Sequence, residues 1–110
     1  MTVKLNAAFF KPFGDEYLPG LLGIVIKEVG ELYLLAELPV QKKLLAPNNY
    51  LHAGAVVTLA DTACGYGCYA NLPEGSTSFT TLELKSNFMG TAREGVVTYE
   101  AKAIHTGRNT

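Results

Sequence analysis

The chain has 110 residues, of which 48% are hydrophobic and 17% are charged, and its formal net charge is −1. This composition predicts a single globular domain over residues 1–110 with one hydrophobic core. The balanced charge without runs of like charges argues against a nucleic-acid partner, and the N-terminal segment lacks the continuous apolar stretch of a secretory signal, so we expect a cytoplasmic protein.

The first half of the chain predicts a short helix followed by a β-hairpin. Three phenylalanines at helical spacing predict the helix within residues 2–13. The stretches 22–29 and 31–38 are rich in apolar residues and flank Gly30, so they predict two antiparallel strands with a turn at that glycine. Pro39 then ends the second strand.

Residues 52–70 are apolar or small at nearly every position and exceed the length of an ordinary strand. We expect a helix buried on almost all sides, which a curved antiparallel sheet would wrap. His52 and Asp61 interrupt the apolar run, and this argues against a membrane span. Cys64 and Cys68 have no nearby histidine and would form a strained disulfide, so buried free thiols are expected rather than a metal site.

Two further strands are expected after this helix, over residues 78–88 and 95–104. In the second of these strands, apolar residues alternate with polar ones, as in a strand with one buried face. The predicted order is therefore α-β-β-α-β-β, and the predicted fold class is α+β.

The loop that leads into the long helix carries the groups best suited to chemistry. Asn48 and Asn49 supply side-chain amides, and the backbone N–H groups of Ala53 and Gly54 stand at the helix start, where they can hold a carbonyl oxygen that becomes negative. His52 has two interpretations: a side chain that hydrogen-bonds the helix start, or a second donor near the reacting carbonyl.

Asp61 is the second candidate group, because a carboxylate in an apolar helix must be stabilised by a partner or serve a function. It is either a hydrogen-bonded structural residue or a base or nucleophile at a cleft. Together with the helix-start amides it suggests acyl transfer or hydrolysis. Ala53 lies eight residues away, about 12 Å along one helix, so one chain cannot easily focus both groups on one bond. Two chains packed antiparallel could, which predicts a homodimer.

These residues resemble the hot-dog-fold thioesterases, and among them the phenylacetate-degradation (PaaI-like) type of acyl-CoA thioesterase. The resemblance is carried by residues 48–54, 59–67, 80–88 and 105–108. It implies a hot-dog fold, with a long central helix wrapped by a curved antiparallel sheet, and dimers that can pair into tetramers. It also implies hydrolysis of a small-to-medium acyl-CoA without a metal or other cofactor, since coenzyme A is part of the substrate.

The resemblance also assigns roles to individual residues. Asp61 matches the catalytic carboxylate, which acts as base or nucleophile. Ala53 and Gly54 match two glycines whose backbone N–H groups polarise the thioester carbonyl, and Ala53 departs from the commoner glycine. Asn48 or Asn49 matches a loop amide that positions the attacking water.

Four residues nearer the C-terminus complete the expected site. Thr81 matches a hydroxyl that helps to hold water or the thioester. His105, Gly107 and Arg108 resemble the segment that approaches the phosphates of coenzyme A, with a solvated tail as the alternative. The resemblance implies one more strand after Thr110, so we expect the domain to lack a C-terminal edge strand. Alternative functions are a non-catalytic acyl-CoA-binding module and a thioester dehydratase or hydratase.

Overall fold

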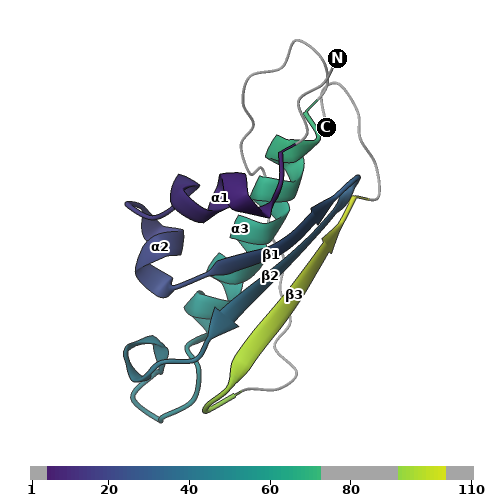
Figure 1. Ribbon diagram of the computed structural model, residues 1–110. Helices are drawn as coiled ribbons and strands as arrows, with labels where there is room; N and C mark the ends of the chain where they lie inside the picture. Colours follow the sequence, from purple (N-terminus) through teal and green to yellow (C-terminus); the bar gives the residue numbers. More distant parts are fainter. Residues whose placement is uncertain (1–4, 73–91, 104–110) are drawn as a thin grey trace.

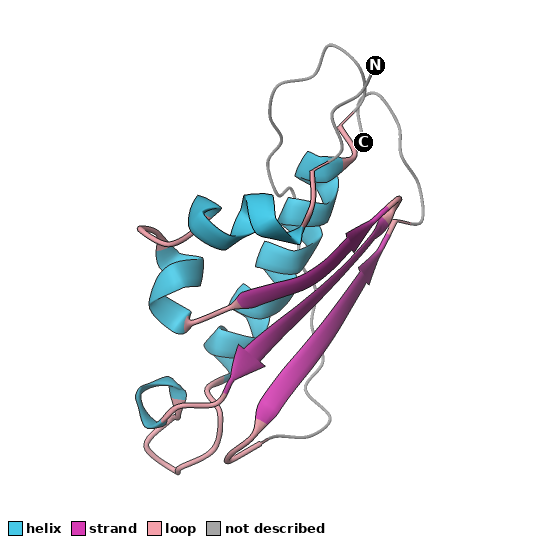
Figure 2. Ribbon diagram, viewed as in Figure 1, coloured by secondary structure: helices cyan, strands magenta, loops and turns pink. Residues whose placement is uncertain are grey.

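The computed structural model describes residues 5–72 and 92–103 (Figure 1). Its elements are α1 (Ala7–Phe13), α2 (Leu18–Leu22), β1 (Val25–Gly30), β2 (Tyr33–Pro39), the 3-10 helix η1 (Lys42–Leu44), α3 (Ala53–Ala70) and β3 (Val96–Lys102). The strands form one antiparallel sheet in the order β1-β2-β3, and α3 lies along it (Figure 2). The predicted α+β class, with a long helix on an antiparallel sheet, is confirmed. The strand predicted over 78–88 lies outside the described residues.

The core forms where β2 and β3 meet one face of α3. Along β2 every second side chain is buried, as the period of a strand requires, and Leu34 and Leu38 are fully enclosed. They pack with Leu59 of α3, which is also 0% exposed, and with Ala101 of β3. The alternation expected in the last strand is present, because Val97, Tyr99 and Ala101 turn toward the core.

One prediction about α3 is wrong within the single chain. The helix is buried on one face, through Ala55, Leu59, Ala60, Thr62 and Ala63. Asp61, Cys64 and Cys68 are exposed, although all three were expected to be buried. Their spacing of three and four residues places them on one stripe of the helix, which stays exposed although Tyr99 of β3 contacts the Cys64 thiol. The two cysteines are free thiols, as expected.

The hairpin turn begins one residue after its predicted place. Gly30 is the last residue of β1, and the turn is made by Glu31 and Leu32. Leu32 has a positive φ of 58°, a backbone conformation that residues other than glycine rarely adopt. Its N–H donates to Oδ1 of Asn71, 3.3 Å away at the end of α3. A tertiary contact thus supports a turn that local sequence did not indicate.

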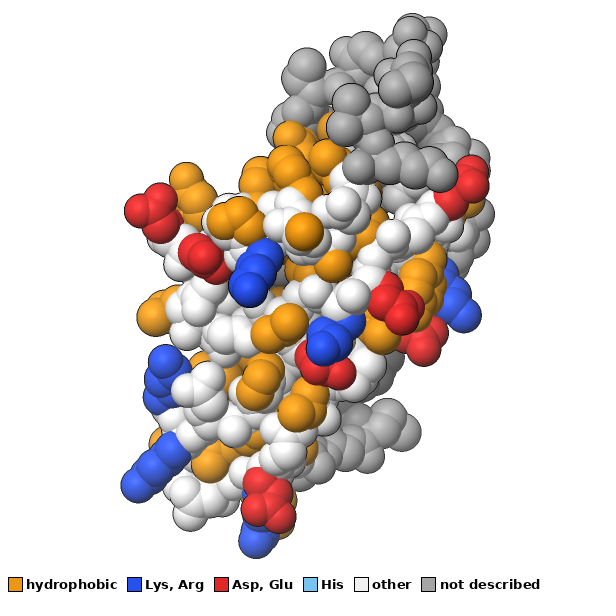
Figure 3. Space-filling model, viewed as in Figure 1, with side chains coloured by type: hydrophobic (Ala, Val, Ile, Leu, Met, Phe, Trp, Pro, Cys, Tyr) orange, Lys and Arg blue, Asp and Glu red, His pale blue; other side chains and the backbone are white. Residues whose placement is uncertain are grey.

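The predicted N-terminal helix begins at Ala7 among the described residues, where Asn6 caps it by accepting the Phe9 N–H at 3.0 Å. The helix α2 was not predicted, because five residues that include Pro19 carry too little periodicity. On the face of the molecule seen in Figure 1, apolar side chains lie among charged ones (Figure 3).

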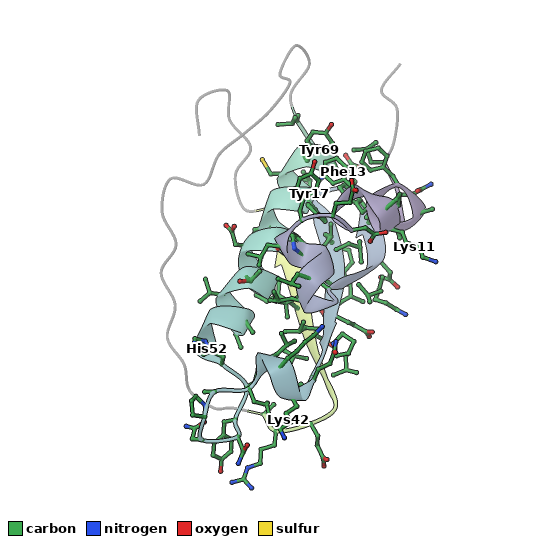
Figure 4. The ribbon with its side chains drawn as sticks, turned by 90° about the vertical axis from the view of Figure 1, so that its left-hand side faces the viewer. Lys11, Phe13, Tyr17, Lys42, His52 and Tyr69 are labelled. Atoms are coloured by element: carbon green, nitrogen blue, oxygen red, sulfur yellow. The ribbon has the colours of Figure 1, made fainter. Side chains whose placement is uncertain are left out.

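Helix α1 is attached to α3 by aromatic rings. Phe10 stacks on Tyr66 with 4.8 Å between ring centroids, and Phe13 stacks on Tyr69 at 5.4 Å. Figure 4 shows Phe13 and Tyr69 near one end of α3, away from His52 at the other end. Gly14 is buried against the Tyr66 hydroxyl, where a side-chain carbon has no room. The rings therefore cover one side of the C-terminal half of α3 and leave its start accessible.

Candidate active site

The start of α3 is capped by His52. Its Nδ1 accepts a hydrogen bond from the Gly54 N–H at 2.8 Å, and its carbonyl accepts from the Ala55 N–H at 2.9 Å. The backbone of His52 is extended, with φ −63° and ψ 132°, as a residue just before a helix requires. The interpretation of His52 as a residue that hydrogen-bonds the helix start is therefore confirmed.

This cap also fixes the proton on the imidazole. Nδ1 accepts a hydrogen bond and so carries no proton, which means that the neutral ring holds its proton on Nε2. The side chain is exposed, so Nε2–H is a donor that another group can reach. The second interpretation of His52, as a donor to a reacting carbonyl, is thus compatible with the first.

The same geometry favours glycine at position 54. A Cβ on this residue would lie 2.9 Å from Nδ1 of His52, closer than a side-chain carbon can approach. Because the Gly54 N–H is engaged by His52, the helix start presents the Ala53 N–H instead. Among the described residues, no acceptor lies within hydrogen-bond range of that N–H.

The loop before the helix is a compact hairpin. Leu45 and Leu51 form an isolated antiparallel bridge, and the Ala46 N–H donates to the Tyr50 carbonyl at 2.7 Å. The Asn48 side-chain oxygen accepts from the Tyr50 N–H at 3.1 Å, which leaves the Asn48 NH₂ group for other partners. Asn49 is exposed and has a left-handed backbone, with φ 68°.

Asp61 stands more than two helical turns after this start and is exposed. It shares its stripe with Cys64, whose thiol lies 3.7 Å from the Tyr99 hydroxyl. That hydrogen bond, followed by burial, raises the pKa of Tyr99. Because α3 is continuous from Ala53 to Ala70, the helix-start amide and the Asp61 carboxylate are separated by about 12 Å along its axis.

Thr81, His105, Gly107 and Arg108 lie outside the described residues. In the described part of the chain, no three His, Cys, Asp or Glu side chains are grouped closely enough to hold a metal ion. None of the helices described there has the length and apolar character needed to cross a bilayer.

Sequence reasoning missed one pair of residues at the loop. Arg93 lies over the ring of Tyr50, with 4.2 Å from Cζ to the ring centroid, and also donates a hydrogen bond to the Tyr50 hydroxyl. Beside them, the Leu51 N–H donates to the Ala92 carbonyl at 2.6 Å. No local pattern could have revealed this pair, because 43 residues separate its members.

Comparison with known proteins reveals similarity to thioesterases. A family model described as the thioesterase superfamily matches residues 48–110, which is more than half of the chain. The 1,4-dihydroxy-2-naphthoyl-CoA hydrolase of Escherichia coli is 32% identical over 107 residues, which is 94% of this chain and 76% of the relative. The enzyme of the same name from Listeria monocytogenes is 34% identical over 89 residues, covering 81% of this chain and 72% of the relative.

A solved structure of a mutant form of thioesterase PA1618 from Pseudomonas aeruginosa has the same fold, with a TM-score of 0.89 and 29% identity. The match covers 96% of this chain and 76% of that one. Thr81, His105, Gly107 and Arg108, which lie outside the described residues, fall within the range 48–110 that the family model matches.

Proposed function

The chain belongs to the thioesterase superfamily, and from that premise we propose that it hydrolyses the thioester bond of an acyl-CoA. The observation that carries the proposal is the start of α3. There the His52 cap leaves the Ala53 N–H and the His52 Nε2–H as donors, and Asp61 lies exposed further along the same helix. No metal or prosthetic group is needed for this chemistry.

The helix start would stabilise the negative oxygen of the transition state. The first N–H groups of a helix have no partner within the helix and carry partial positive charge. The Ala53 N–H would hold the thioester oxygen, and Nε2–H of His52 would be the second donor. Gly54 serves this arrangement indirectly, because its N–H fixes the imidazole and its lack of a side chain leaves room for the ring.

Asp61 would activate the attacking water or attack the thioester itself. Since it lies about 12 Å along the helix from Ala53, the carboxylate would come from a second copy of the chain. In a two-fold pairing of antiparallel helices, Ala53 of one copy faces Asp61 of the other, and Val57, midway between them, lies beside the axis. The exposed stripe of α3 supports this proposal, because the small residues along it allow close approach.

The remaining predicted residues would complete the site. Asn48 or Asn49 would position water, and Thr81 would assist. His105, Gly107 and Arg108 would contact the coenzyme A phosphates.

For the acyl group, we favour an aromatic one, because two relatives are named 1,4-dihydroxy-2-naphthoyl-CoA hydrolase and the sequence resembles thioesterases of phenylacetate degradation. The first assay would offer 1,4-dihydroxy-2-naphthoyl-CoA, phenylacetyl-CoA and straight-chain acyl-CoAs. Release of the free thiol from an aryl-CoA is expected. Binding of acyl-CoA without hydrolysis would instead favour the binding-module function.

The oxyanion role is tested by Ala53→Pro, with Ala53→Ser as its matched control. Proline removes only the N–H at the first helical position, where it is tolerated, and the ψ of 132° at His52 suits a residue before proline. We expect kcat to fall about 10²–10³-fold in the proline variant and little in the serine variant. A proline variant that folds normally and keeps its rate would exclude the Ala53 amide.

The two-chain site is tested by mixing inactive variants. In a hybrid of Asp61→Asn and Ala53→Pro subunits, one site combines two intact halves, so an equal mixture should regain about one quarter of the parent activity. If both groups act within one chain, the mixture stays inactive. A Val57→Cys variant with Cys64→Ser and Cys68→Ser should also form a disulfide-linked dimer across the proposed axis, whereas a monomer at assay concentration would contradict the pairing.

A further inference from the structure

We propose that Arg93 is a positioning residue for the active-site loop: its contacts with Tyr50 hold the loop of residues 45–52 in the conformation that catalysis needs. The inference rests on the proposed function, because it concerns the rate of that reaction. It adds a residue from the turn before β3 to a site otherwise built from α3 and the loop before it.

The contact between the two residues is specific in geometry. The Arg93 guanidinium carbon lies 4.2 Å from the centroid of the Tyr50 ring, and the same group donates to the Tyr50 hydroxyl. An arginine can stack on a ring and donate from its planar fork, whereas a lysine offers only a point charge. Stacking and hydrogen bonding on one ring restrain both the position and the direction of the Tyr50 side chain.

Tyr50 is the part of the loop tip through which such a restraint can act. Pro47, Asn48 and Asn49 are exposed, while Tyr50 is half-buried. The hydrogen bonds of the tip are internal: the Asn49 N–H donates to Ala46, and the Tyr50 N–H donates to Asn48. These bonds define the shape of the tip but do not fix it to the rest of the protein.

The fixing contacts come from the segment of Arg93. The Leu51 N–H donates to the Ala92 carbonyl at 2.6 Å. Arg93, the residue after Ala92, donates to the hydroxyl of Tyr50, the residue before Leu51. The loop continues directly into His52, whose own N–H donates to the Leu44 carbonyl at 2.9 Å. A shift of the tip would therefore move Asn48, and the imidazole that follows it, relative to the Ala53 N–H.

A small displacement of such groups lowers the rate more than the affinity. Misplacement by about 1 Å can cost on the order of 10²-fold in rate. We expect Arg93→Met to lower kcat about tenfold to a hundredfold, with KM within about twofold of the parent value. Tyr50→Leu should have a similar effect, and Arg93→Lys should lie between the parent and Arg93→Met. Lys102→Met is the matched control, because it removes an exposed cation of β3 and should keep the parent rate.

The double variant decides how Arg93 acts. If Arg93 works through Tyr50, Arg93→Met should have little further effect on kcat in the Tyr50→Leu background. A raised KM that persists in that background would overturn the proposal and assign Arg93 to direct contact with the negatively charged substrate. A lower melting temperature with unchanged kcat would also overturn it and leave a purely structural role.

A second readout does not depend on activity. Hydrogen exchange of the backbone N–H groups of Ala46, Asn49 and Leu51 should accelerate in Arg93→Met, while exchange in the middle of α3 stays as in the parent. Unchanged exchange at these positions would overturn the proposal even if the rate falls. If the parent protein hydrolyses no acyl-CoA, the proposed function fails, and the exchange experiment still decides whether Arg93 orders the loop.

Discussion

Replacing His52 by alanine and by asparagine separates its two tasks. In the structure, Nδ1 accepts the Gly54 N–H at 2.8 Å, and Nε2–H is left as a donor. Alanine removes both functions. Asparagine keeps an oxygen that can accept the Gly54 N–H, and it is among the best residues at the position before a helix, but it has no ring nitrogen reaching as far as Nε2.

The expected magnitudes differ for stability and for rate. Loss of a side-chain cap costs about 1 kcal/mol, which corresponds to a fall of about 5 °C in melting temperature for a domain of this size. His52→Ala should show this loss and His52→Asn little of it. Removal of one donor to a developing oxyanion costs about 10²–10³-fold in kcat, and both variants should show that loss.

Thermal unfolding followed by circular dichroism, at one protein concentration for all variants, measures the first effect. Steady-state hydrolysis of an aryl-CoA measures the second. Should His52→Asn retain the parent kcat, Nε2–H is not a catalytic donor. Should His52→Ala unfold at the parent temperature, the hydrogen bond to Gly54 does not stabilise the helix start, and the reasoning from the cap fails.

Three further predictions concern stability. Leu59 is 0% exposed, so Leu59→Ala should lower the free energy of unfolding by about 3 kcal/mol in chemical denaturation, and a change below about 1 kcal/mol would contradict its place in the core. Gly14→Ala should destabilise the fold by about 1–3 kcal/mol because its Cβ would meet the Tyr66 hydroxyl; adding Tyr66→Phe should restore part of that stability, and no restoration would refute the clash. Burial, followed by the Asp15 carboxylate, raises the pKa of Tyr66 above 10.0, so the folded chain binds the phenol proton more tightly than the unfolded chain does. The resulting stability is fully present below about pH 10 and is lost as the pH rises through the raised pKa, and this loss should be smaller in Tyr66→Phe when unfolding is measured across that range.

Local features of the sequence were sufficient for the main elements. The helix predicted over 52–70 differs from α3 by one residue, because a long run of small and apolar residues and its capping group are both local. The hairpin was predicted, but its turn was placed at Gly30. The structure places it at Leu32, whose positive φ is accompanied by a hydrogen bond from its N–H to Asn71, 39 residues away.

In the candidate site, too, some features could be predicted from local sequence and others depend on tertiary contacts. From sequence, His52, Ala53, Gly54 and Asp61 could be named, because a polar loop before an apolar helix is visible in one dimension. Which N–H the helix start offers could not be predicted, since this depends on the rotation of one imidazole ring over Gly54. Arg93 could not be connected to Tyr50, because nothing local relates two residues that are 43 positions apart and meet only in the folded chain.

The fold class, the long helix and the chemical groups at its start could all be predicted from the amino-acid sequence. These follow from the period of apolar residues and from the composition of one short segment. The folded arrangement was needed to show which face of α3 is covered and that Asp61 is exposed in the single chain. Periodicity could not reveal this, because the apolar and small residues surround the helix almost evenly, so the side that is buried is chosen by the position of the sheet.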